Sequence, residues 1–564
     1  MFFLASNKSQ SERGTGYTRL QTRSGFGTIL ASAGRILGRY LAKWPESGFV
    51  QIGHRSPSFN LTISERDRNN IVMSPDGNSK SPAYKIYAAL IVFASFATTI
   101  LLLPRVYLNF KNQYFLTHVE GVWLACAHDF LHGVFYRPLF GPLGYGGTRY
   151  FPLYFVSTAW LSKPLGSLET AGIAVSGACV VLTLIAVYVL LRRMNVSTLL
   201  SVAGVTAILS VASTQQALLG AKGDSLAAAA NLWGVLVCTS SNFRRRAIYL
   251  GAALFTLAFA TKLTTVFGVA AVFVAWFLAK RAKEAIELAV ATGIGYAIVL
   301  GAMYVGSGGR VFAIFKACAG GGGSLSYTIQ APIHLLSKAL DVDPTFLFFL
   351  IPAFAFGLYY FLQDKTDLWA IYFAFVLAVT TVIFGSLGIG INHLFDLQVA
   401  SVILLVVAIS RIATFTEIGT GILAASLIVG LVPTMQGLHG DLTRPSFRND
   451  ADEVLLRLHN DNRPILAENP LVAIKSGKSA YILDPFMFRI LAMKQPALAN
   501  DLWDKIKHRS FGAIALVRDP ATAEGKEWYT STHFGGEFLR DLDENYSFGF
   551  KVGNIIVYRP KVSP

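Results

Sequence analysis

Residues 117–154 read THVEGVWLACAHDFLHGVFYRPLFGPLGYGGTRYFPLY, a polar and aromatic loop, rich in Gly and Pro, between hydrophobic stretches long enough to cross a bilayer. The loop carries two acidic residues, Glu120 and Asp129, among aromatic side chains. A chain built mostly of membrane-spanning helices has few places for polar chemistry, and ionisable residues near such helices mark functional sites. We therefore interpret the rest of the chain around this loop.

The composition of the chain indicates a polytopic membrane protein. Of its 564 residues, 53% are hydrophobic and only 15% are charged, whereas soluble domains carry about 25% charged residues. The formal net charge is +16, but the Lys and Arg residues lie mainly in the N-terminal tail and in short clusters between hydrophobic stretches. The positive-inside rule explains such clusters. We therefore expect the membrane, and no nucleic acid, as a partner.

The hydrophobic stretches predict an α-helical architecture. A membrane-spanning helix needs about 20 apolar residues, and fewer where neighbouring helices protect it. Residues 151–161 are too short to span and are predicted to form a helix at the outer interface. Counting them as a span would place most basic clusters outside, against the positive-inside rule. We predict eleven spans, at about 84–104, 170–191, 197–214, 224–241, 247–261, 263–279, 286–305, 346–362, 367–387, 395–411 and 417–435.

This topology divides the chain into three parts. Residues 1–83 are predicted to form a basic, mostly disordered cytoplasmic tail. Residues 84–435 form the transmembrane domain, with outer loops at 105–169 and 306–345. Residues 436–564 form a small extracytoplasmic α/β domain, because their short apolar stretches end in Pro or Asn as strands do. The N-terminus is thus cytoplasmic and the C-terminus extracytoplasmic.

Ionisable residues near the spans collect on one side of the predicted membrane. Lys222 and Asp224 begin the fourth span, and Lys262 lies at the tip between the fifth and sixth spans. His393 and Asp396 begin the tenth span. Ionisable residues are costly near the membrane interior, so this convergence predicts a polar site at the outer leaflet. The residues that lie in outer loops or near outer helix ends are Arg105, Glu120, Asp129, Arg137, Arg149, Lys222, Asp224, Lys262, His393 and Asp396.

Several of these residues also have a structural interpretation. Lys262 can extend to lipid headgroups, and Asp224 and Asp396 are favoured at helix N-termini by the helix dipole. His393 and Asp396 lie one turn apart and could bind a metal, but two ligands are few for such a site. A capping box that includes Glu120 would satisfy the first turn of a helix. Glu120 is therefore either a helix cap or a catalytic carboxylate.

The cysteines give little functional information. Cys126, Cys179, Cys238 and Cys318 show no metal-binding spacing. Cys126 and Cys318 lie on the same predicted side, so a disulfide between them is compatible with the topology, although free apolar cysteines are the simpler interpretation.

Short motifs follow the first span in a definite order. They are Val119-Glu120-Gly121, a helix ending at Gly133, Tyr136-Arg137-Pro138, Arg149-Tyr150-Phe151-Pro152-Leu153-Tyr154, and later Lys222-Gly223-Asp224 and Thr261-Lys262. This order resembles that of the C-type glycosyltransferases, a superfamily of multi-span enzymes that use polyprenyl-phosphate sugars and that includes the protein O-mannosyltransferases and the aminoarabinose transferases. The resemblance covers residues 84–435. Where the family often has Asp-Glu, this chain has Val119 before Glu120.

The resemblance implies a membrane glycosyltransferase of the bacterial inner (plasma) membrane. Such an enzyme would move a hexose or pentose, with inversion, from a polyprenyl-phosphate donor to a hydroxyl of a glycan, lipid or protein acceptor on the outer face. A lipid-linked donor needs no nucleotide site, and residues 320–323 lack the Lys and Ser or Thr of a phosphate-binding loop. No cofactor is expected, although a divalent metal is compatible with the reaction.

Transfer from a lipid phosphate requires a nucleophilic acceptor hydroxyl and a neutralised phosphate leaving group. We assign Glu120 as the general base, because a positioned carboxylate contributes about a hundredfold to ten-thousandfold in rate. Fixed cations stabilise the developing phosphate charge, and Arg149, Lys222 and Lys262 are the candidates. The other candidate substrate-binding residues are Tyr150 and Tyr154, which would stack on the sugar or position the lipid, and Asp224, His393 and Asp396.

Two other functions are compatible with the sequence. A transporter or flippase for a lipid-linked sugar or another amphiphile would also be polytopic, but transporters place charges near the bilayer midplane within repeated halves. The sequence shows neither an evident repeat nor a midplane charge pair. An assembly or anchoring role would rest on the C-terminal domain alone. The enzyme is therefore the favoured interpretation.

Overall fold

The computed structural model describes residues 81–240, 245–319 and 323–562, all of which belong to one compact unit. The tail predicted for residues 1–83 lies almost wholly outside the described residues. The domain boundaries predicted from the sequence stay predictions.

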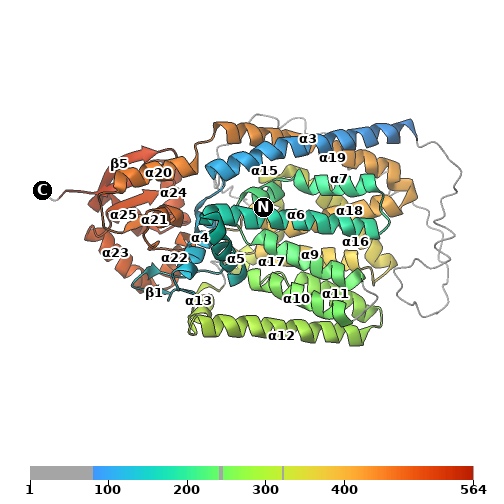
Figure 1. Ribbon diagram of the computed structural model, residues 1–564, viewed down its shortest axis with the longest axis horizontal. Coiled ribbons are helices and arrows are strands. Elements are labelled where there is room, and N and C mark those ends of the chain that lie inside the picture. Colours follow the sequence, from blue (N-terminus) through green and yellow to red (C-terminus); the bar gives the residue numbers. More distant parts are fainter. Residues whose placement is uncertain (1–80, 241–244, 320–322, 563–564) are drawn as a thin grey trace, which may run out of the picture. The chain divides into compact units, whose positions relative to one another are not determined.

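The described chain consists of a helical part followed by a C-terminal part (Figure 1). The helical part contains α3 (Pro82–Asn112), α4 (His118–Leu131), β1 (Phe140–Gly141), β2 (Gly144–Tyr145), α5 (Pro152–Leu165), α6 (Leu168–Arg193), α7 (Thr198–Leu209), α8 (Ala212–Leu219), α9 (Asp224–Ser240), α10 (Arg245–Thr261), α11 (Phe267–Leu278), α12 (Ala282–Gly306), α13 (Arg310–Cys318), α14 (Leu325–Ile329), α15 (Ala331–Val342), η1 (Pro344–Phe346), α16 (Leu347–Gln363), α17 (Leu368–Ile383), η2 (Ile391–Leu394), α18 (Phe395–Arg411) and α19 (Ala413–Thr443). The C-terminal part contains α20 (Phe447–Leu458), β3 (Ile465–Ala467), α21 (Pro470–Lys475), α22 (Pro485–Lys494), η3 (Pro496–Ala499), α23 (Asn500–Lys507), β4 (Ala513–Leu516), α24 (Ala523–Ser531), α25 (Gly536–Asn545), β5 (Tyr546–Val552) and β6 (Ile555–Pro560).

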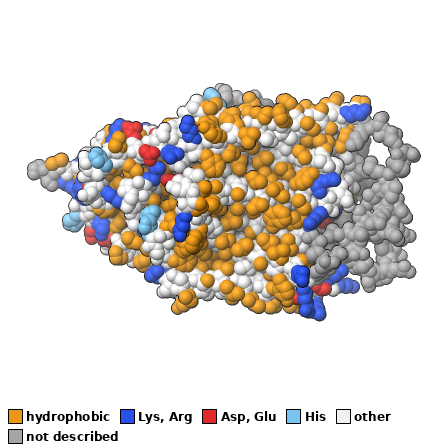
Figure 2. Space-filling model, viewed as in Figure 1, with side chains coloured by type: hydrophobic (Ala, Val, Ile, Leu, Met, Phe, Trp, Pro, Cys, Tyr) orange, Lys and Arg blue, Asp and Glu red, His pale blue; other side chains and the backbone are white. Residues whose placement is uncertain are grey.

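The helical part presents an apolar surface that suits a lipid environment. Helix α3 exposes Val92, Phe93, Phe96 and Leu103, each at least 60% accessible. On the face shown in Figure 2, hydrophobic side chains cover the helices, whereas charged side chains gather over the C-terminal part. In water such a surface would be costly. We therefore treat the chain as a multi-pass membrane protein.

The described residues contain six helices that are long and apolar enough to cross a membrane, or seven if the bent pair of α7 and α8 is one span. All eleven predicted spans coincide with helices, and α5 occupies the place of the predicted interfacial helix. Helices α9, α11 and α17 are apolar but shorter. The number of eleven spans therefore stays a prediction.

The third predicted span, residues 197–214, is not one straight helix, because α7 and α8 meet at 72°. Polar residues at the start of α8 account for the break. The hydroxyls of Ser213 and Thr214 donate to Gln398 Oε1 over 2.5 and 3.0 Å. The Asp343 carboxylate accepts the first N–H of α8 over 2.6 Å. These partners replace the hydrogen bonds that an unbroken helix would make, and α8 leads the chain directly into the loop before α9.

Two large hydrophobic cores organise the described part of the chain. One core surrounds α18 itself, which is the most enclosed of the candidate spans: 89% of the most apolar 18-residue stretch of η2 and α18 is buried. The other core joins α4 and α5 to the C-terminal part, through residues such as Trp123, Tyr154, Ile482 and Phe488. The C-terminal sheet has the order β3-β4-β6-β5, in which β3 and β4 are parallel and the other pairs antiparallel. The polar residues between these cores form the candidate site.

Candidate active site

Glu120 lies in the first turn of α4 and is 2% exposed. The capping box that the sequence predicts is present: the Thr117 N–H donates to Glu120 Oε2 over 3.0 Å, and the Thr117 hydroxyl also bonds this oxygen. The other carboxylate oxygen, Oε1, lies 2.9 Å from Lys222 Nζ. Glu120 is thus a helix cap and also the ion-pair partner of a predicted phosphate-binding lysine.

A second ion pair forms beside the first, around Asp224 at the start of α9. Lys262 Nζ donates to Asp224 Oδ1 over 2.6 Å, and Asn392 Nδ2 donates to Asp224 Oδ2 over 2.8 Å. His393 Nδ1 lies 4.0 Å from Asp224 Oδ1. Asp396 is close enough to Lys262 to interact with it electrostatically. The structure therefore brings together residues from three distant segments of the chain.

The short loop between α8 and α9 holds both ion pairs in place. The Lys222 N–H and C=O both bond the Ser176 hydroxyl over 3.1 Å, which fixes the backbone at this residue. A Cβ added at Gly220 would lie 3.2 Å from Glu120 Oε1, and one at Gly223 would lie 2.9 Å from the Trp123 ring. Small residues on either side of Lys222 thus let the loop approach α4 closely.

Arg149 and Tyr150 lie next to this pair of clusters. The Tyr150 ring stacks on Trp123 with ring centroids 3.9 Å apart and planes at 10°. Arg149 lies over the Phe486 ring, 5.9 Å from its centroid. In the described part of the chain no carboxylate forms an ion pair with Arg149, whereas Lys222 and Lys262 are both paired. Arg149 is thus the cation with the fewest protein partners among the three predicted phosphate ligands.

Tyr154 occupies a different environment from the other predicted residues. Its side chain is fully buried, and its hydroxyl bonds Gly172 O and Ser176 Oγ over 2.9 Å each. Its ring meets Trp123 edge to face. Packing therefore accounts for Tyr154 in this conformation, and its predicted stacking on a sugar stays untested.

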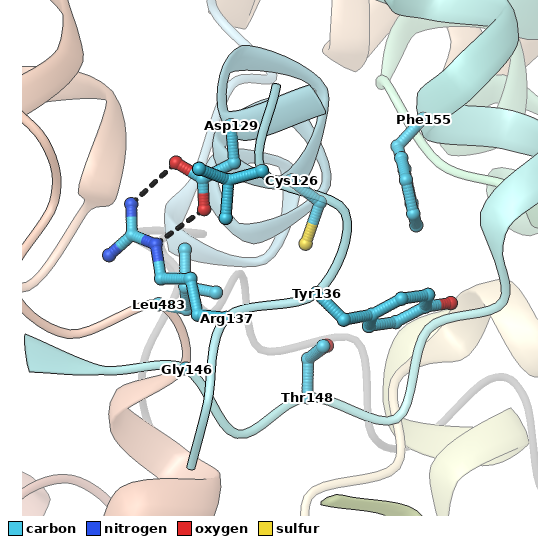
Figure 3. Close-up of a pocket in the computed structure, with 9 residues that line it drawn as sticks. Cys126, Asp129, Tyr136, Arg137, Gly146, Thr148, Phe155 and Leu483 are labelled. Atoms are coloured by element: carbon cyan, nitrogen blue, oxygen red, sulfur yellow. Dashed lines mark hydrogen bonds and ion pairs between the residues drawn. The ribbon is translucent and has the colours of Figure 1, made fainter. Parts of the chain in front are cut away.

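The second acid of the opening loop, Asp129, belongs to a structural pair (Figure 3). Arg137 bonds both Asp129 carboxylate oxygens, over 2.5 and 2.6 Å, and also donates to the carbonyls of Leu143 and Ala480. Asp129 and Arg137 border a cavity of about 10 Å³, together with Cys126. A space of this size holds at most one water. Arg137 therefore ties the loop to the C-terminal part.

A larger cavity of about 310 Å³, widely open to the surface, lies just before the start of α11, and its first lining residue, Thr264, follows Lys262 by two positions. Its walls are almost wholly apolar, and they come from the segment just before α11 and from the last turns of α17. The lining residues are Thr264, Val266, Ala378, Val379, Val382 and Ile383. None of the nine predicted site residues lines this cavity or the small one. An apolar space of this kind suits a hydrocarbon chain.

The C-terminal part packs directly on the first turn of α4, which the sequence did not predict. Glu468 is fully buried and accepts hydrogen bonds from Trp528, Tyr529 and His533 over 2.6 to 2.7 Å. Burial alone would raise the pKa of Glu468, but its hydrogen bond and charge interaction with His533 hold that pKa at about 2. The His118 ring meets the rings of Trp528 and His533. Burial and the charge of His533 lower the pKa of His118 to about 3.

Asn392, Glu468 and Asp484 are polar site neighbours that the sequence reasoning missed. Asp484 caps α22 by accepting the Met487 N–H over 3.0 Å, and it lies near Arg149. Burial raises the pKa of Asp484. The Asn-His-Leu-Phe-Asp order around His393 was the only available signal for Asn392, and a lone Asn in a loop is a weak one.

The last features to place are possible metal ligands and the four cysteines. Across residues 81–240, 245–319 and 323–562, no group of three or more His, Cys, Asp or Glu side chains is placed to hold a metal ion. The expectation about cofactors stays untested. All four cysteines are buried and free, so Cys126 and Cys318 are not bridged.

Comparison with solved structures identifies two similar architectures. ArnT from Cupriavidus metallidurans bound to undecaprenyl phosphate is 11% identical, with a TM-score of 0.52 over 82% of this chain and 97% of its own. The archaeal oligosaccharyltransferase AglB from Archaeoglobus fulgidus, in complex with an inhibitory peptide and a dolichol-phosphate, is 12% identical, with a TM-score of 0.50 over 84% of this chain and 74% of its own. No protein-family model and no curated protein matches the chain. The likeness to these two structures shows that this chain shares the fold of ArnT and AglB.

Proposed function

We propose that this protein is an inverting glycosyltransferase that moves a sugar from a polyprenyl-phosphate donor to an acceptor hydroxyl on the outer face of a bacterial inner membrane. The observation that carries the proposal is the convergence of Glu120, Lys222, Asp224 and Lys262 into two adjacent ion pairs. They come from three separate segments of the chain, at Glu120, residues 222–224 and Lys262. The acceptor is a glycan, lipid or protein hydroxyl.

The solved structures with this fold support the donor class. One of them holds undecaprenyl phosphate and the other dolichol-phosphate, and both ligands are polyprenyl phosphates. In this chain Thr264, which lines the apolar cavity, follows Lys262 by two residues. A lipid tail in this cavity would carry its phosphate toward Lys262. The donor phosphate would then meet Lys222, Lys262 and Arg149.

In the proposed reaction, Glu120 removes the proton from the acceptor hydroxyl. The acceptor oxygen forms a bond to the anomeric carbon while the bond from that carbon to the phosphate oxygen breaks. The electron pair leaves with the polyprenyl phosphate, whose charge Arg149, Lys222 and Lys262 stabilise. Attack opposite the leaving phosphate inverts the anomeric centre.

Lys222 connects the two halves of this reaction. Its ammonium lies 2.9 Å from Glu120 Oε1 when no donor is present. The donor phosphate is a diester whose single negative charge would compete with the Glu120 carboxylate for the same ammonium, and the charge on the phosphate grows as the polyprenyl phosphate leaves. Lys222 would then move toward the phosphate and leave Glu120 Oε1 free to accept the acceptor proton, so that donor binding switches on the base. Asp224, Asn392, His393 and Asp396 would hold Lys262 for the same phosphate.

The test uses the purified protein in liposomes with undecaprenyl-phosphate-linked hexoses and pentoses and a mixture of membrane glycans and lipids as acceptors. We expect wild-type protein to transfer one of these sugars, and Glu120→Gln to lose at least a hundredfold in rate, because the amide cannot accept the proton. Glu453→Gln is the matched control, since Glu453 also pairs with a cation, Arg457, but on the exposed surface of α20. Full activity of Glu120→Gln would remove Glu120 as the base.

A transporter for a lipid-linked sugar is the second candidate, because of the break between α7 and α8. Broken helices are typical of transporter binding sites. A flippase would move a fluorescent undecaprenyl-phosphate sugar across the liposome bilayer without changing it. Translocation without any new glycosidic bond would favour this function over the enzyme.

A further inference from the structure

In the C-terminal part, the Asn469 side chain hydrogen-bonds on both sides of the contact with α4. Its Oδ1 accepts the Leu471 N–H over 3.1 Å and so caps α21. Its Nδ2 donates to Leu116 O over 3.1 Å, in a buried contact with the segment before α4. A single amide therefore fixes the start of a helix in each part of the chain.

The carbonyl that Asn469 holds belongs to the same peptide group that binds Glu120. Leu116 C=O and Thr117 N–H are the two ends of one planar peptide. The Thr117 N–H donates to Glu120 Oε2 over 3.0 Å. Because the peptide is rigid, fixing its carbonyl also fixes the direction of its N–H, and hence the position of the Glu120 carboxylate.

The surroundings of this peptide leave little room for it to rotate. On one side a Cβ at Gly121 would lie 2.3 Å from Asn469 Oδ1 and 2.9 Å from Pro470 Cδ, so α4 packs directly on α21. On the other side the His118 ring rests against Trp528 and His533, both of which bind Glu468. Glu468 directly precedes Asn469 in the chain.

We infer that Asn469 is a positioning residue for Glu120, so that the C-terminal part is a component of the catalytic centre and orients the base through the peptide between Leu116 and Thr117. This inference rests on the proposed function of Glu120. It makes Asn469 act on turnover through Glu120 without touching the substrate. Donor binding should depend on the cations and on the apolar cavity, and not on Asn469.

The test variant is Asn469→Ser, which keeps a capping oxygen for α21 but lacks the second polar atom that reaches Leu116. Asn469→Asp is a second variant that keeps the shape and the cap and replaces the donor NH₂ by an acceptor oxygen. The matched control is Ser446→Ala. Ser446 caps α20 by accepting the Asn449 N–H and donates to Asn112 O, each over 3.2 Å, so it makes the same kind of double contact, but the carbonyl it holds is not in the peptide that binds Glu120.

With the donor that the wild-type protein uses, we expect Asn469→Ser to lower kcat by about tenfold and to leave KM for the donor unchanged, because misorienting a catalytic group costs turnover and not binding. The acid limb of its pH–rate profile should move to higher pH. Ser446→Ala should change neither. Turnover and a pH profile of Asn469→Ser equal to those of Ser446→Ala would overturn the inference.

Hydrogen–deuterium exchange of the full chain in lipid nanodiscs tests the same contact without any sugar transfer. Exchange at the Thr117 amide should be about fivefold faster in both Asn469 variants, as expected for one lost hydrogen bond, and unchanged in Ser446→Ala. Unchanged exchange in the Asn469 variants refutes the coupling. If the exchange result holds while wild-type protein transfers no sugar, the contact stands and the proposed function fails.

Discussion

Replacing Gly121 by Ala would insert a methyl group at the tightest contact between α4 and the C-terminal part. An ideal Cβ at this position lies 2.3 Å from Asn469 Oδ1 and 2.9 Å from Pro470 Cδ, so one helix must move. Gly121 is helical, and Ala would gain about 1 kcal/mol in helix propensity. Overpacking of a dense contact costs about 1–3 kcal/mol. We expect Gly121→Ala to destabilise the protein by about 1 kcal/mol net, and also to displace Glu120 and slow transfer.

Thermal unfolding of the purified chain in detergent measures this effect. Gly293→Ala in α12 is the control, because an added Cβ there meets no atom within 4 Å, and its melting temperature should be equal to or above that of the wild type. Combining Gly121→Ala with Asn469→Ser removes the clashing amide, so the double variant should be more stable than the sum of the single effects predicts. A melting temperature of Gly121→Ala that matches Gly293→Ala, or strictly additive effects, would refute this reasoning.

Two further predictions concern pH and phosphate binding. The folded pKa of His118 is about 3 and its ordinary value is 6.5, so stability from its neutral form is complete above pH 6.5 and falls as the pH drops toward 3; Glu468, with a folded pKa of about 2 against 4.5, adds a loss below pH 4.5. Between pH 7.5 and 4.5 the titration of His118 should lower the free energy of unfolding by at most about 1.4 kcal/mol per pH unit, which melting temperatures measured across this range would detect. A His118→Gln variant whose stability falls with pH as steeply as that of the wild type would contradict this cause. Arg149→Met should weaken binding of undecaprenyl phosphate by about tenfold to a hundredfold, as the loss of a hydrogen bond to a charged group does. Titration of detergent-solubilised protein measures this affinity, and Lys505→Met on the surface of the C-terminal part is the control. Equal affinities of the Arg149→Met and Lys505→Met variants would exclude Arg149 as a phosphate ligand.

The sequence predicted the helices well, because apolar stretches of about 20 residues leave few alternatives in a bilayer. It failed at residues 197–214, where the apolar composition suggested one span. The break there depends on Gln398 and Asp343, which are 130 or more residues away and satisfy the polar start of α8. Such long-range partners cannot be read from a local hydrophobic pattern.

For the candidate site, the sequence indicated which charged residues would gather but not how they would pair. Charges in an apolar chain are costly, and for this reason Lys222, Asp224 and Lys262 could be expected to meet. Pairing was not predictable, since spacing in the sequence does not say which carboxylate neutralises which lysine. The partners of Tyr154 were not predictable either: its place in an aromatic motif suggested ligand contact, which stays a prediction, and its hydroxyl bonds Gly172 and Ser176 inside the protein.

The two interpretations of Glu120 that the sequence left open are compatible with each other in the structure. The capping bonds use Oε2, and the ion pair with Lys222 uses Oε1. A cap that occupies one oxygen holds the carboxylate in place without consuming the other, and catalysis benefits from a base held in a fixed position. The capping box is then the means by which the base is oriented. Thr117→Ala removes the side chain that completes the capping box. It should therefore reduce turnover by more than the loss of stability from a single helix cap would account for.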